Sequence, residues 1–512
     1  MNNGKICVSV SAETADEMIG NIKRAEEFAD VIEVRFDSLE PSQVDKCRME
    51  IAGLIVKKPL LATFRSPEQG GNNTASVEDR TAFWRNPSPG FWAADVEEDV
   101  FSKAANWNDR ILSYHDFEKT PDDLDAVYFR LAASDTDVVK IAVRADDILD
   151  TIPVWKLLKR AKSQNKQIVP IAMGEVGKWT RILGLAYGAF MTYASLDSRG
   201  ETAPGQITAR DLVEIYRVRE LDENTKVFGV IGDPVAQSLS PYIHNTAFAF
   251  QKVNAVFVPF LVKDIEEFMR RLVKCKTREI ELNFGGFSVT MPHKQTIMKH
   301  LDAIDPTAEK IGAVNTVKIE AGKLTGYNTD AHGFITPLKE KFGDLSGVRV
   351  ALFGAGGAAR ACVYALKQEK ADVTVFARDL HKAELLANEF DVKFAKLSRT
   401  KDQRSKADLS GFEIVVDTTP LGMTGQFENE SLFKAEQLDG VKFVYDLVTT
   451  PTDTPIIREA KKAGIPAFGG LEMLIGQGAR QFEIWTGRSA PLDEMRESVF
   501  ARINSELFST TV

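Results

Sequence analysis

Eight short apolar segments follow one another through the first 196 residues, each separated from the next by a segment with a helical pattern. They are CVSV, VIEVRF, PLLATFR, FWAADV, ILSYHDF, VVKIAV, QIVPIAM and FMTYASL. Apolar runs separated by single amphipathic helices are typical of parallel strands in βα units. Eight such units are the number that closes a barrel. The sequence therefore predicts an α/β fold that begins with a (β/α)8 TIM barrel.

The barrel pattern stops near residue 222. We expect a helix over residues 211–221 that ends in the polar stretch 222–225, after which a new strand, VFGVIG, begins. A further strand, VRVALFG, runs directly into a glycine-rich turn. We therefore expect a barrel over 1–222, an α/β substrate domain over 223–332 with a C-terminal helix (485–512, starting near 485) returning to it, and a Rossmann-like nucleotide-binding domain over 333–484.

Composition excludes several classes of protein. A hydrophobic fraction of 44% and a charged fraction of 27% are those of a globular protein. The net charge of −9 argues against a broad surface for nucleic acid or membrane. The four cysteines show no metal-ligand spacing, and there is neither a signal-peptide pattern nor an apolar run of ~18 residues. We expect a cytoplasmic protein with reduced cysteines, no metal, and no nucleic-acid or membrane partner.

Charged residues occur inside the strand patterns of the barrel. Alternate residues of a barrel strand point to the interior, and catalytic groups gather at the carboxyl ends of the strands. In VIEVRF, LLATFR and VVKIAV this rule turns Glu33, Arg35, Thr63, Arg65 and Lys140 inward. A lone strand lysine is usually solvated. Burial of uncompensated charge costs several kcal/mol, so the convergence of these residues favours a site.

The chemistry of these residues indicates a reaction class. A desolvated lysine amine, such as that of Lys140, attacks a ketone to form an iminium, which stabilises an adjacent carbanion. His115, in SYHDF, supplies a base near neutral pH. The guanidinium groups of Arg35, Arg65 and Arg181 can bind a carboxylate. We predict an imine-assisted elimination or aldol-type cleavage of an anionic keto substrate.

The segments EVR, TFRS followed by GG, SYHDF, VVKIAV and APGQI together resemble type I 3-dehydroquinate dehydratases. The resemblance implies that Lys140 is the Schiff-base lysine and that His115 is the general acid and base, which removes the C2 proton and protonates the leaving C1 hydroxyl. It implies as substrate ligands Glu33, Arg35, Arg65, Arg181, Thr202 and Gln206. Gln69 stands where the family has a glutamate that orients the histidine, so we expect an active dehydratase with a less well oriented His115.

The turn after VRVALFG indicates a dinucleotide site. Gly354, Gly356 and Gly357 of FGAGGAARA follow a strand and open a helix, where backbone amides can hold a pyrophosphate. The loop also contains Ala355 and Ala358. The next strand ends in Arg378, followed by Lys382, rather than in the carboxylate that binds a ribose hydroxyl. This pattern favours NADP over NAD.

The segment between the barrel and the glycine-rich turn contains GDPVAQSLSPYIHN, GFSVTMPHK, GAVNTV and YNTDAHG, whose small polar residues suit a polyhydroxylated ligand. Carbonyl reduction needs a proton donor beside the hydride acceptor, and Lys294 with Asp330 are the candidates. An ordinary surface ion pair is the alternative.

Together with GLEMLIGQGARQFEIWTG, these segments resemble shikimate dehydrogenases over residues 226–508. The resemblance implies Lys294 with Asp330 as the catalytic pair, and Arg378 with Lys382 at the 2′-phosphate. The implied substrate ligands are Ser238, Ser240, Thr290, Asn315, Asp330, Gln477 and Gln481, and the residues near the nicotinamide are Thr419, Met423 and Met473. Gln237 replaces the family's histidine and Thr449 its carboxylate-binding tyrosine, so we expect a raised KM for shikimate.

The two resemblances, in this order, imply a bifunctional enzyme of the shikimate pathway of aromatic amino acid biosynthesis. It would be a lyase that converts 3-dehydroquinate to 3-dehydroshikimate and an oxidoreductase that reduces this product to shikimate with NADPH. We expect a monomer whose partners are these small molecules. A quinate dehydrogenase is one alternative, against which Ser240 and Thr290 speak. A non-catalytic metabolite sensor is another, and it would not need both catalytic sets.

Overall fold

The computed structural model describes residues 2–72, 75–197, 200–398, 405 and 407–510. The chain forms two compact units. The first comprises Met1–Pro241 and Val253–Phe284, and the second comprises Tyr242–Lys252 and Gly285–Val512.

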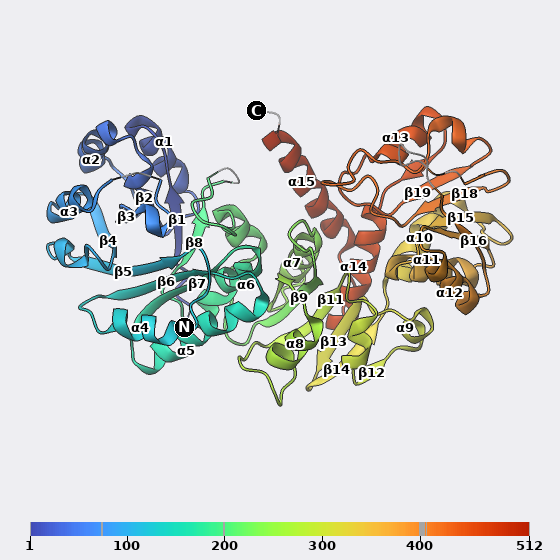
Figure 1. Cartoon of the computed structure of the whole chain (residues 1–512), viewed down its shortest axis with the longest axis horizontal. Helices are drawn as coiled ribbons and strands as arrows, with labels where there is room; N and C mark the ends of the chain where they lie inside the picture. The colour runs from blue at the N-terminus through green and yellow to red at the C-terminus, as the bar shows by residue number, and fades with distance from the viewer. Residues whose placement is uncertain (1, 73–74, 198–199, 399–404, 406, 511–512) are drawn as a thin grey trace. The chain divides into compact units, whose positions relative to one another are not determined.

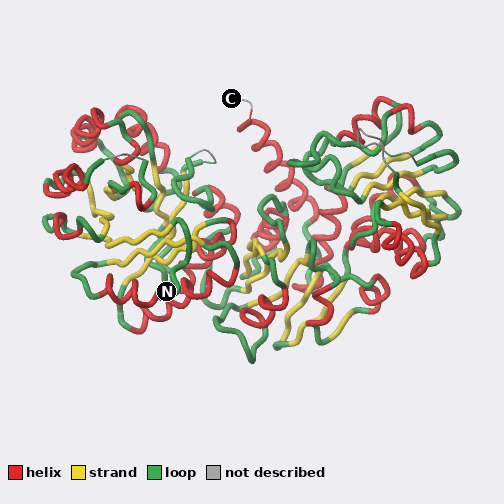
Figure 2. Tube along the Cα trace, viewed as in Figure 1, coloured by secondary structure: helices red, strands yellow, loops and turns green. Residues whose placement is uncertain are grey.

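The first unit contains an eight-stranded parallel sheet that curls into a barrel (Figures 1 and 2). The strands are β1 (Ile6–Val10), β2 (Val31–Arg35), β3 (Leu60–Thr63), β4 (Phe91–Glu97), β5 (Asp109–Asp116), β6 (Val138–Arg144), β7 (Gln167–Met173) and β8 (Thr192–Ser195). They lie in the order β7-β6-β5-β4-β3-β2-β1-β8, and a hydrogen bond from Phe190 N to Ile168 O (2.8 Å) links the segment before β8 to β7. The predicted TIM barrel is confirmed.

Helices cover the outside of the barrel (Figure 1). They are α1 (Ala15–Ala25), α2 (Val44–Ala52), α3 (Val77–Arg85), α4 (Leu124–Ala132), α5 (Thr151–Ser163) and α6 (Lys178–Leu183). Local sequence sets where they begin. Ser76, for example, accepts a hydrogen bond from Asp79 N, and the Asp79 carboxylate accepts one from Ser76 N, which closes a capping box at α3.

The barrel interior is layered. One apolar layer holds Cys7, Val31, Leu61, Ala93, Ile111, Val138 and Val169. Inward residues recur every second position. The next inward position therefore lies two residues further along each strand. On the first six strands this position holds a polar residue: Ser9, Glu33, Thr63, Asp95, Ser113 and Lys140. The apolar layer closes the barrel beneath the polar one, so the polar groups collect at the carboxyl ends of the strands.

One predicted helix of the first unit is wrong in extent. The helix expected over residues 211–221 is a single turn at Asp211–Ile215. Arg217 has a positive φ of 49°, which cannot continue a right-handed helix, and its guanidinium donates to Ala255 O at 2.8 Å. The chain then forms β9 (Lys226–Gly232), β10 (Ala255–Leu261), parallel to β9, and α8 (Ile265–Phe268).

The second unit contains two further parts. The helices of the first part are α7 (Ser240–Phe250), α9 (Pro306–Ile311) and α10 (Asp330–Phe342), and its strands are β11 (Phe284–Val289), β12 (Ala303–Ile304), β13 (Thr316–Glu320) and β14 (Lys323–Tyr327). Of α7 and β11, only the residues from Tyr242 and from Gly285 onward belong to the second unit. β13 pairs antiparallel with both β11 and β14.

The second part is a parallel sheet in the order β17-β16-β15-β18-β19-β20. Its strands are β15 (Arg349–Phe353), β16 (Asp372–Ala377), β17 (Lys393–Lys396), β18 (Ile414–Asp417), β19 (Phe443–Asp446) and β20 (Ala467–Phe468), and its helices are α11 (Gly357–Gln368), α12 (Leu380–Phe390) and α13 (Pro455–Lys462). This order, in which the third, second and first strands precede the fourth, is that of the Rossmann fold, as predicted.

The C-terminal helix starts later than expected. α14 (Leu471–Thr486) runs through residue 485, and α15 (Leu492–Thr510) follows. Gly487 ends α14 in the left-handed region (φ 69°), and Pro491 precedes α15. Within the second unit α15 returns to α7, where Ser498 Oγ donates to Tyr242 O at 3.3 Å. No helix in the described ranges is both long and apolar enough to cross a membrane.

We predict that Gly177→Ala destabilises the barrel. A Cβ at Gly177 would lie 2.0 Å from the carbonyl oxygen of Ala172, which belongs to β7 and cannot move freely. We expect the free energy of unfolding to fall by about 2–4 kcal/mol. Urea unfolding followed by tryptophan fluorescence measures this, because the buried Trp179 lies nearby. Gly20→Ala on α1 is the control: its Cβ meets nothing within 4 Å, so stability should stay or rise by up to about 1 kcal/mol. Equal losses in both variants would contradict the prediction.

Candidate active sites

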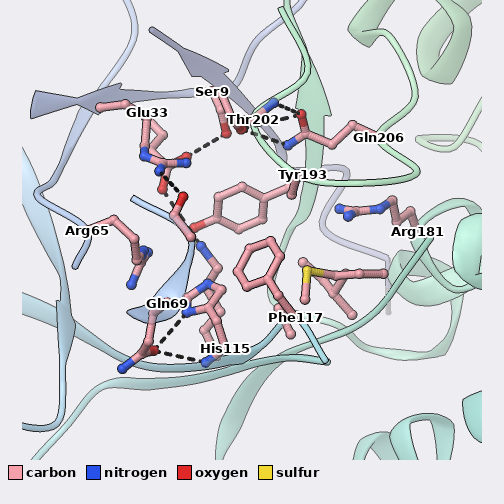
Figure 3. Close-up of a pocket in the computed structure, with 17 residues that line it drawn as sticks. Ser9, Glu33, Arg65, Gln69, His115, Phe117, Arg181, Tyr193, Thr202 and Gln206 are labelled. Carbon is pink, nitrogen blue, oxygen red and sulfur yellow. Dashed lines mark hydrogen bonds and ion pairs between the residues drawn. The ribbon is translucent and has the colours of Figure 1, made fainter. Parts of the chain in front are cut away.

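The first site is a pocket at the carboxyl ends of the barrel strands (Figure 3). Lys140 is one of the residues that line it. Lys140 Nζ donates to Asp95 Oδ2 at 2.7 Å and lies 3.7 Å from Glu33 Oε1. Arg65 donates to the other oxygen of Asp95 at 2.9 Å. Burial alone would raise the pKa of Asp95, but the charges of Arg65 and Lys140 outweigh it and hold that pKa well below its ordinary value. Asp95 is therefore a permanent anion between two cations.

Two further buried carboxylates, Glu33 and Asp37, are held by hydrogen bonds. Glu33 accepts hydrogen bonds from Ser9 Oγ (2.5 Å) and Thr63 Oγ1 (2.9 Å). Asp37 accepts two from Arg35, at 2.9 and 2.8 Å. The guanidinium of Arg35, predicted to bind a substrate carboxylate, is thus already paired with a carboxylate of the protein.

Gln69 holds His115 at the end of β5. The Gln69 Oε1 atom accepts from the backbone N of His115 at 3.0 Å and lies 3.2 Å from its Nδ1 (Figure 3). An amide oxygen can only accept, so Nδ1 carries the proton and Nε2 is the basic atom. Burial, with the charges of Arg65 and Lys140, keeps the pKa of His115 well below its ordinary value. The imidazole is therefore neutral and in one tautomer.

Arg181, on α6, is the least compensated cation of the pocket. It is buried, its Nη2 lies 3.5 Å from Pro204 O, and its Nε has no hydrogen-bond partner among the described residues. Burial lowers the pKa of its guanidinium to about 10. The charge of Glu201 opposes this effect, but no described carboxylate forms an ion pair with Arg181. A buried cation without a directly bonded carboxylate fits an anionic ligand.

The loop after β8 supplies the remaining polar groups. Gln206 Oε1 accepts from Thr202 N at 2.8 Å, and Gln206 Nε2 donates to Thr202 Oγ1 at 3.1 Å. Most of the barrel residues singled out from the sequence line the pocket, namely Glu33, Arg35, Arg65, Gln69, His115, Lys140, Arg181, Thr202 and Gln206. Thr63 is not among the lining residues and instead donates to Glu33. Asp95 and Tyr193 escaped sequence reasoning. The acidic residue within the apolar run FWAADV was the available signal for Asp95.

The second site lies in the second unit, around Lys294 and Asp330. Lys294 Nζ is 2.5 Å from Asp330 Oδ2, and the Asp330 carboxylate is buried. Asn315 Nδ2 donates to Asp330 Oδ1 (2.7 Å) and lies 3.3 Å from Gln477 Oε1. Thr290 follows β11, four residues before Lys294. This is a braced lysine–carboxylate pair rather than a pair of solvated surface residues.

Gln481, on α14, is fully buried and bonded within the protein. Its Nε2 donates to Ser288 Oγ (3.1 Å) and Thr316 Oγ1 (3.0 Å), and its Oε1 lies 3.1 Å from His244 Nε2. Burial lowers the pKa of His244 to about 3, so this imidazole is neutral. A substrate contact by Gln481 would have to replace one of these bonds. Ser238 and Ser240 lie in the first unit, where Ser240 N donates to Ser238 Oγ at 3.3 Å.

The glycine-rich turn has the shape that a dinucleotide requires. Gly354 has a positive φ of 117°, and a Cβ there would lie 2.2 Å from Thr418 Oγ1. Gly356 has open space around its Cβ position, and the amides that follow it begin the twelve-residue α11. A Cβ on Gly357 would lie 3.2 Å from Lys294 Cδ, so the turn lies against the stem of the lysine.

The other residues predicted to contact the cofactor lie in the same unit as this turn. Arg378 and Lys382 are exposed at the end of β16 and in the first turn of α12, and neither side chain forms an ion pair with a described residue. Thr419 N donates to Asp417 Oδ1 at 2.8 Å, Met423 lies in the loop after β18, and Met473 is buried on α14. Ala355 and Ala358 flank the glycines. A glycine cradle at a helix start with two free cations nearby fits NADP.

Comparison with known proteins assigns both halves. The family model of type I 3-dehydroquinase matches residues 6–223. Those of the shikimate dehydrogenase substrate binding domain, of shikimate/quinate 5-dehydrogenase and of the shikimate 5'-dehydrogenase C-terminal domain match residues 230–317, 337–437 and 470–500.

The relatives agree with the family models. A chloroplastic bifunctional 3-dehydroquinate dehydratase/shikimate dehydrogenase of Arabidopsis thaliana is 34% identical over 96% of this chain and 83% of its own. A shikimate dehydrogenase (NADP(+)) of Methanocaldococcus jannaschii is 40% identical over 55% of this chain and 99% of its own. A crystal structure of shikimate dehydrogenase with NADP+ covers 55% of this chain and 97% of its own, with 38% identity and a TM-score of 0.50.

The chain belongs to the family of bifunctional 3-dehydroquinate dehydratase/shikimate dehydrogenases. It is a fused enzyme of the shikimate pathway, a type I dehydroquinase followed by an NADP-dependent shikimate dehydrogenase. The function and the cofactor expected from the sequence are confirmed.

We predict that Gln69→Glu moves the acid limb of dehydratase kcat/KM to higher pH. The imidazole of His115 could act as the predicted base only when neutral, and its low pKa keeps it neutral in mildly acidic solution. A carboxylate beside Nδ1 stabilises the imidazolium and so raises that pKa. The pH profile of each variant measures the shift.

Gln69→Ala separates charge from orientation. It removes the acceptor without adding charge, so we expect kcat/KM to fall about 10-fold with no upward movement of the limb. A Gln69→Glu profile that coincides with that of the parent enzyme would mean that Gln69 does not set the state of His115.

Proposed function

We propose that the barrel dehydrates 3-dehydroquinate through an imine on Lys140. Nζ adds to the ketone carbon, whose oxygen leaves as water, and an iminium forms. His115 Nε2 removes a proton from C2, and the C–H electrons move into the iminium to give an enamine. The enamine expels the C1 hydroxyl, which leaves as water with the proton that His115 returns. Hydrolysis of the iminium releases 3-dehydroshikimate and restores the amine.

The observation that carries this proposal is the juxtaposition of an inward lysine, buried beside Asp95, with a neutral histidine of fixed tautomer in one pocket. We propose that Arg181 binds the substrate carboxylate, because it is the buried guanidinium that lacks an internal carboxylate. Glu33, Arg35, Arg65, Thr202 and Gln206 would bind hydroxyls or hold the ligands in place.

We propose that Lys294 and Asp330 serve the reduction. NADPH, when bound, supplies the hydride. Lys294 Nζ gives a proton to the carbonyl oxygen of 3-dehydroshikimate as it becomes the hydroxyl of shikimate, and Asp330 orients the ammonium. Asn315 and Gln477 keep that carboxylate in place. Thr290, Ser238, Ser240 and Gln481 are the further proposed substrate residues, with Thr419, Met423 and Met473 beside the nicotinamide.

Three broader proposals complete the assignment. We propose domain boundaries at 222/223 and 332/333, with the helix α15 belonging to the substrate domain. We propose that the chain acts as a monomer, since each catalytic set comes from a single copy. We propose a cytoplasmic location, which suits four unpaired cysteines.

Two variants should separate the activities. We expect Lys140→Met to abolish dehydratase turnover, by at least about 1,000-fold, and to leave NADP-dependent shikimate oxidation unchanged, with Lys294→Met doing the reverse. Borohydride added with 3-dehydroquinate should fix a ligand mass on the Lys140 peptide of the parent and of Lys294→Met, but not of Lys140→Met. An adduct on another lysine would overturn the barrel proposal.

We expect Arg378→Ser to lower kcat/KM for NADP about 100-fold and to leave kcat/KM for NAD unchanged. The reason is that the guanidinium would contact the 2′-phosphate, which NADP has and NAD lacks. Initial rates of shikimate oxidation with each cofactor test this. Lys393→Ser, which removes an exposed cation from β17, is the matched control and should change neither. A parallel loss with both cofactors would contradict the role of Arg378.

A further inference from the structure

Tyr193 presents the face of its ring to the amine of Lys140. Lys140 Nζ lies 3.8 Å from the ring centroid, and the ring projects into the centre of the pocket (Figure 3). Tyr193 lies on β8 and is 3% exposed, so water does not screen the contact. A cation over an aromatic face is attracted by the ring quadrupole, and the attraction grows when both are desolvated.

The hydroxyl of Tyr193 makes a second contact with the same group. It lies 3.4 Å from Asp95 Oδ2, the oxygen that accepts from Lys140 at 2.7 Å. Burial and the nearby Cys7, Asp95 and Glu33 raise the pKa of the phenol well above its ordinary value. The phenol therefore keeps its proton and donates it toward Asp95. One side chain thus acts on the lysine both directly and through its counter-ion.

We propose that Tyr193 is a positioning residue of the dehydratase reaction, whose ring holds the positive nitrogen of Lys140 and whose hydroxyl holds Asp95. This inference rests on the proposed role of Lys140. The nitrogen is positive as an ammonium and again as an iminium, and the ring favours both states. A neutral imine withdraws electrons from the C2–H bond far less than its protonated form does. By favouring the protonated imine over the neutral one, the ring keeps the lysine adduct in the form from which His115 can remove the C2 proton.

Packing alone is the competing explanation. Tyr193 also belongs to an apolar cluster of the barrel interior that includes Val169 and Met191. A packing role would lower the number of correctly folded sites, whereas a positioning role lowers the rate at each folded site. The two are told apart by turnover per trappable lysine.

The test uses Tyr193→Phe and Tyr193→Leu in the full chain. Borohydride with saturating 3-dehydroquinate counts the sites that form an imine, and kcat is divided by this count. Tyr128→Phe is the control for loss of a buried hydroxyl, because Tyr128 OH bonds Gln164 outside the pocket. Phe190→Leu is the control for loss of a ring beneath a cation, because Lys5 lies 4.6 Å from it. Shikimate oxidation by the same samples reports the integrity of the other half.

We expect kcat per trapped site to fall about 5-fold in Tyr193→Phe and about 30-fold in Tyr193→Leu, with little change in KM and none in the two controls. Equal kcat per trapped site in Tyr193→Leu and the parent enzyme would overturn the proposal, as would an equal loss in Phe190→Leu. Absence of an adduct on Lys140 in the parent enzyme would instead refute the proposed function on which it rests.

Discussion

The dehydratase half depends on a buried carboxylate that two cations share. Asp95 accepts from Lys140 through one oxygen and from Arg65 through the other, and all three side chains are almost inaccessible. Removing an ion from water costs several kcal/mol, and the cost is recovered only where each charge has a close partner. The barrel meets this condition by placing Asp95 on β4, which lies between β6, the strand of Lys140, and β3, after which Arg65 follows by two residues.

Most of the other buried arginines of the barrel are also paired with carboxylates of the protein. Arg35 is paired with Asp37, and Arg80 contacts both Glu97 and Asp99. Arg181 forms no ion pair in the described part of the chain, and the charge of Glu201 acts on it only from a distance. The apolar layer beneath keeps water away from the charges. The proposed substrate anion would therefore bind at Arg181, in the pocket that Lys140 also lines.

In the dehydrogenase half, the lysine is positioned by one carboxylate and by the glycine-rich turn. This lysine is held by a carboxylate that Asn315 fixes, and the contact of Gly357 with the stem of Lys294 brings the dinucleotide turn beside that lysine. A side chain at residue 357 would press on the lysine. A glycine at this position therefore leaves room for the lysine that we propose as the proton donor.

Strand parity was enough to turn Lys140, Glu33 and Arg65 inward from the sequence, because the two-residue period is a rigid property of strands. Parity could not show which charges pair. Asp95 was missed because the rule was not applied to FWAADV, where it would have turned this acidic residue inward. Parity also could not show that Gln481 is bonded to His244, since that contact joins residues 237 positions apart. The extents of the helices expected at 211–221 and near 485 were wrong. Arg217 and Gly487 take left-handed conformations at these two places. The local sequence gives no sign of this at Arg217, and at Gly487 the glycine itself is the only sign.

The central claim is that one chain performs a dehydration and a reduction in sequence. Stopped-flow mixing of the parent enzyme with 3-dehydroquinate and excess NADPH tests it, with enone absorbance and NADPH oxidation followed together. The account predicts that the enone appears before NADPH is consumed and that one NADPH is oxidised for each 3-dehydroquinate converted to shikimate. NADPH oxidation that starts without a lag and yields quinate, or an enone that accumulates with no oxidation, would contradict it.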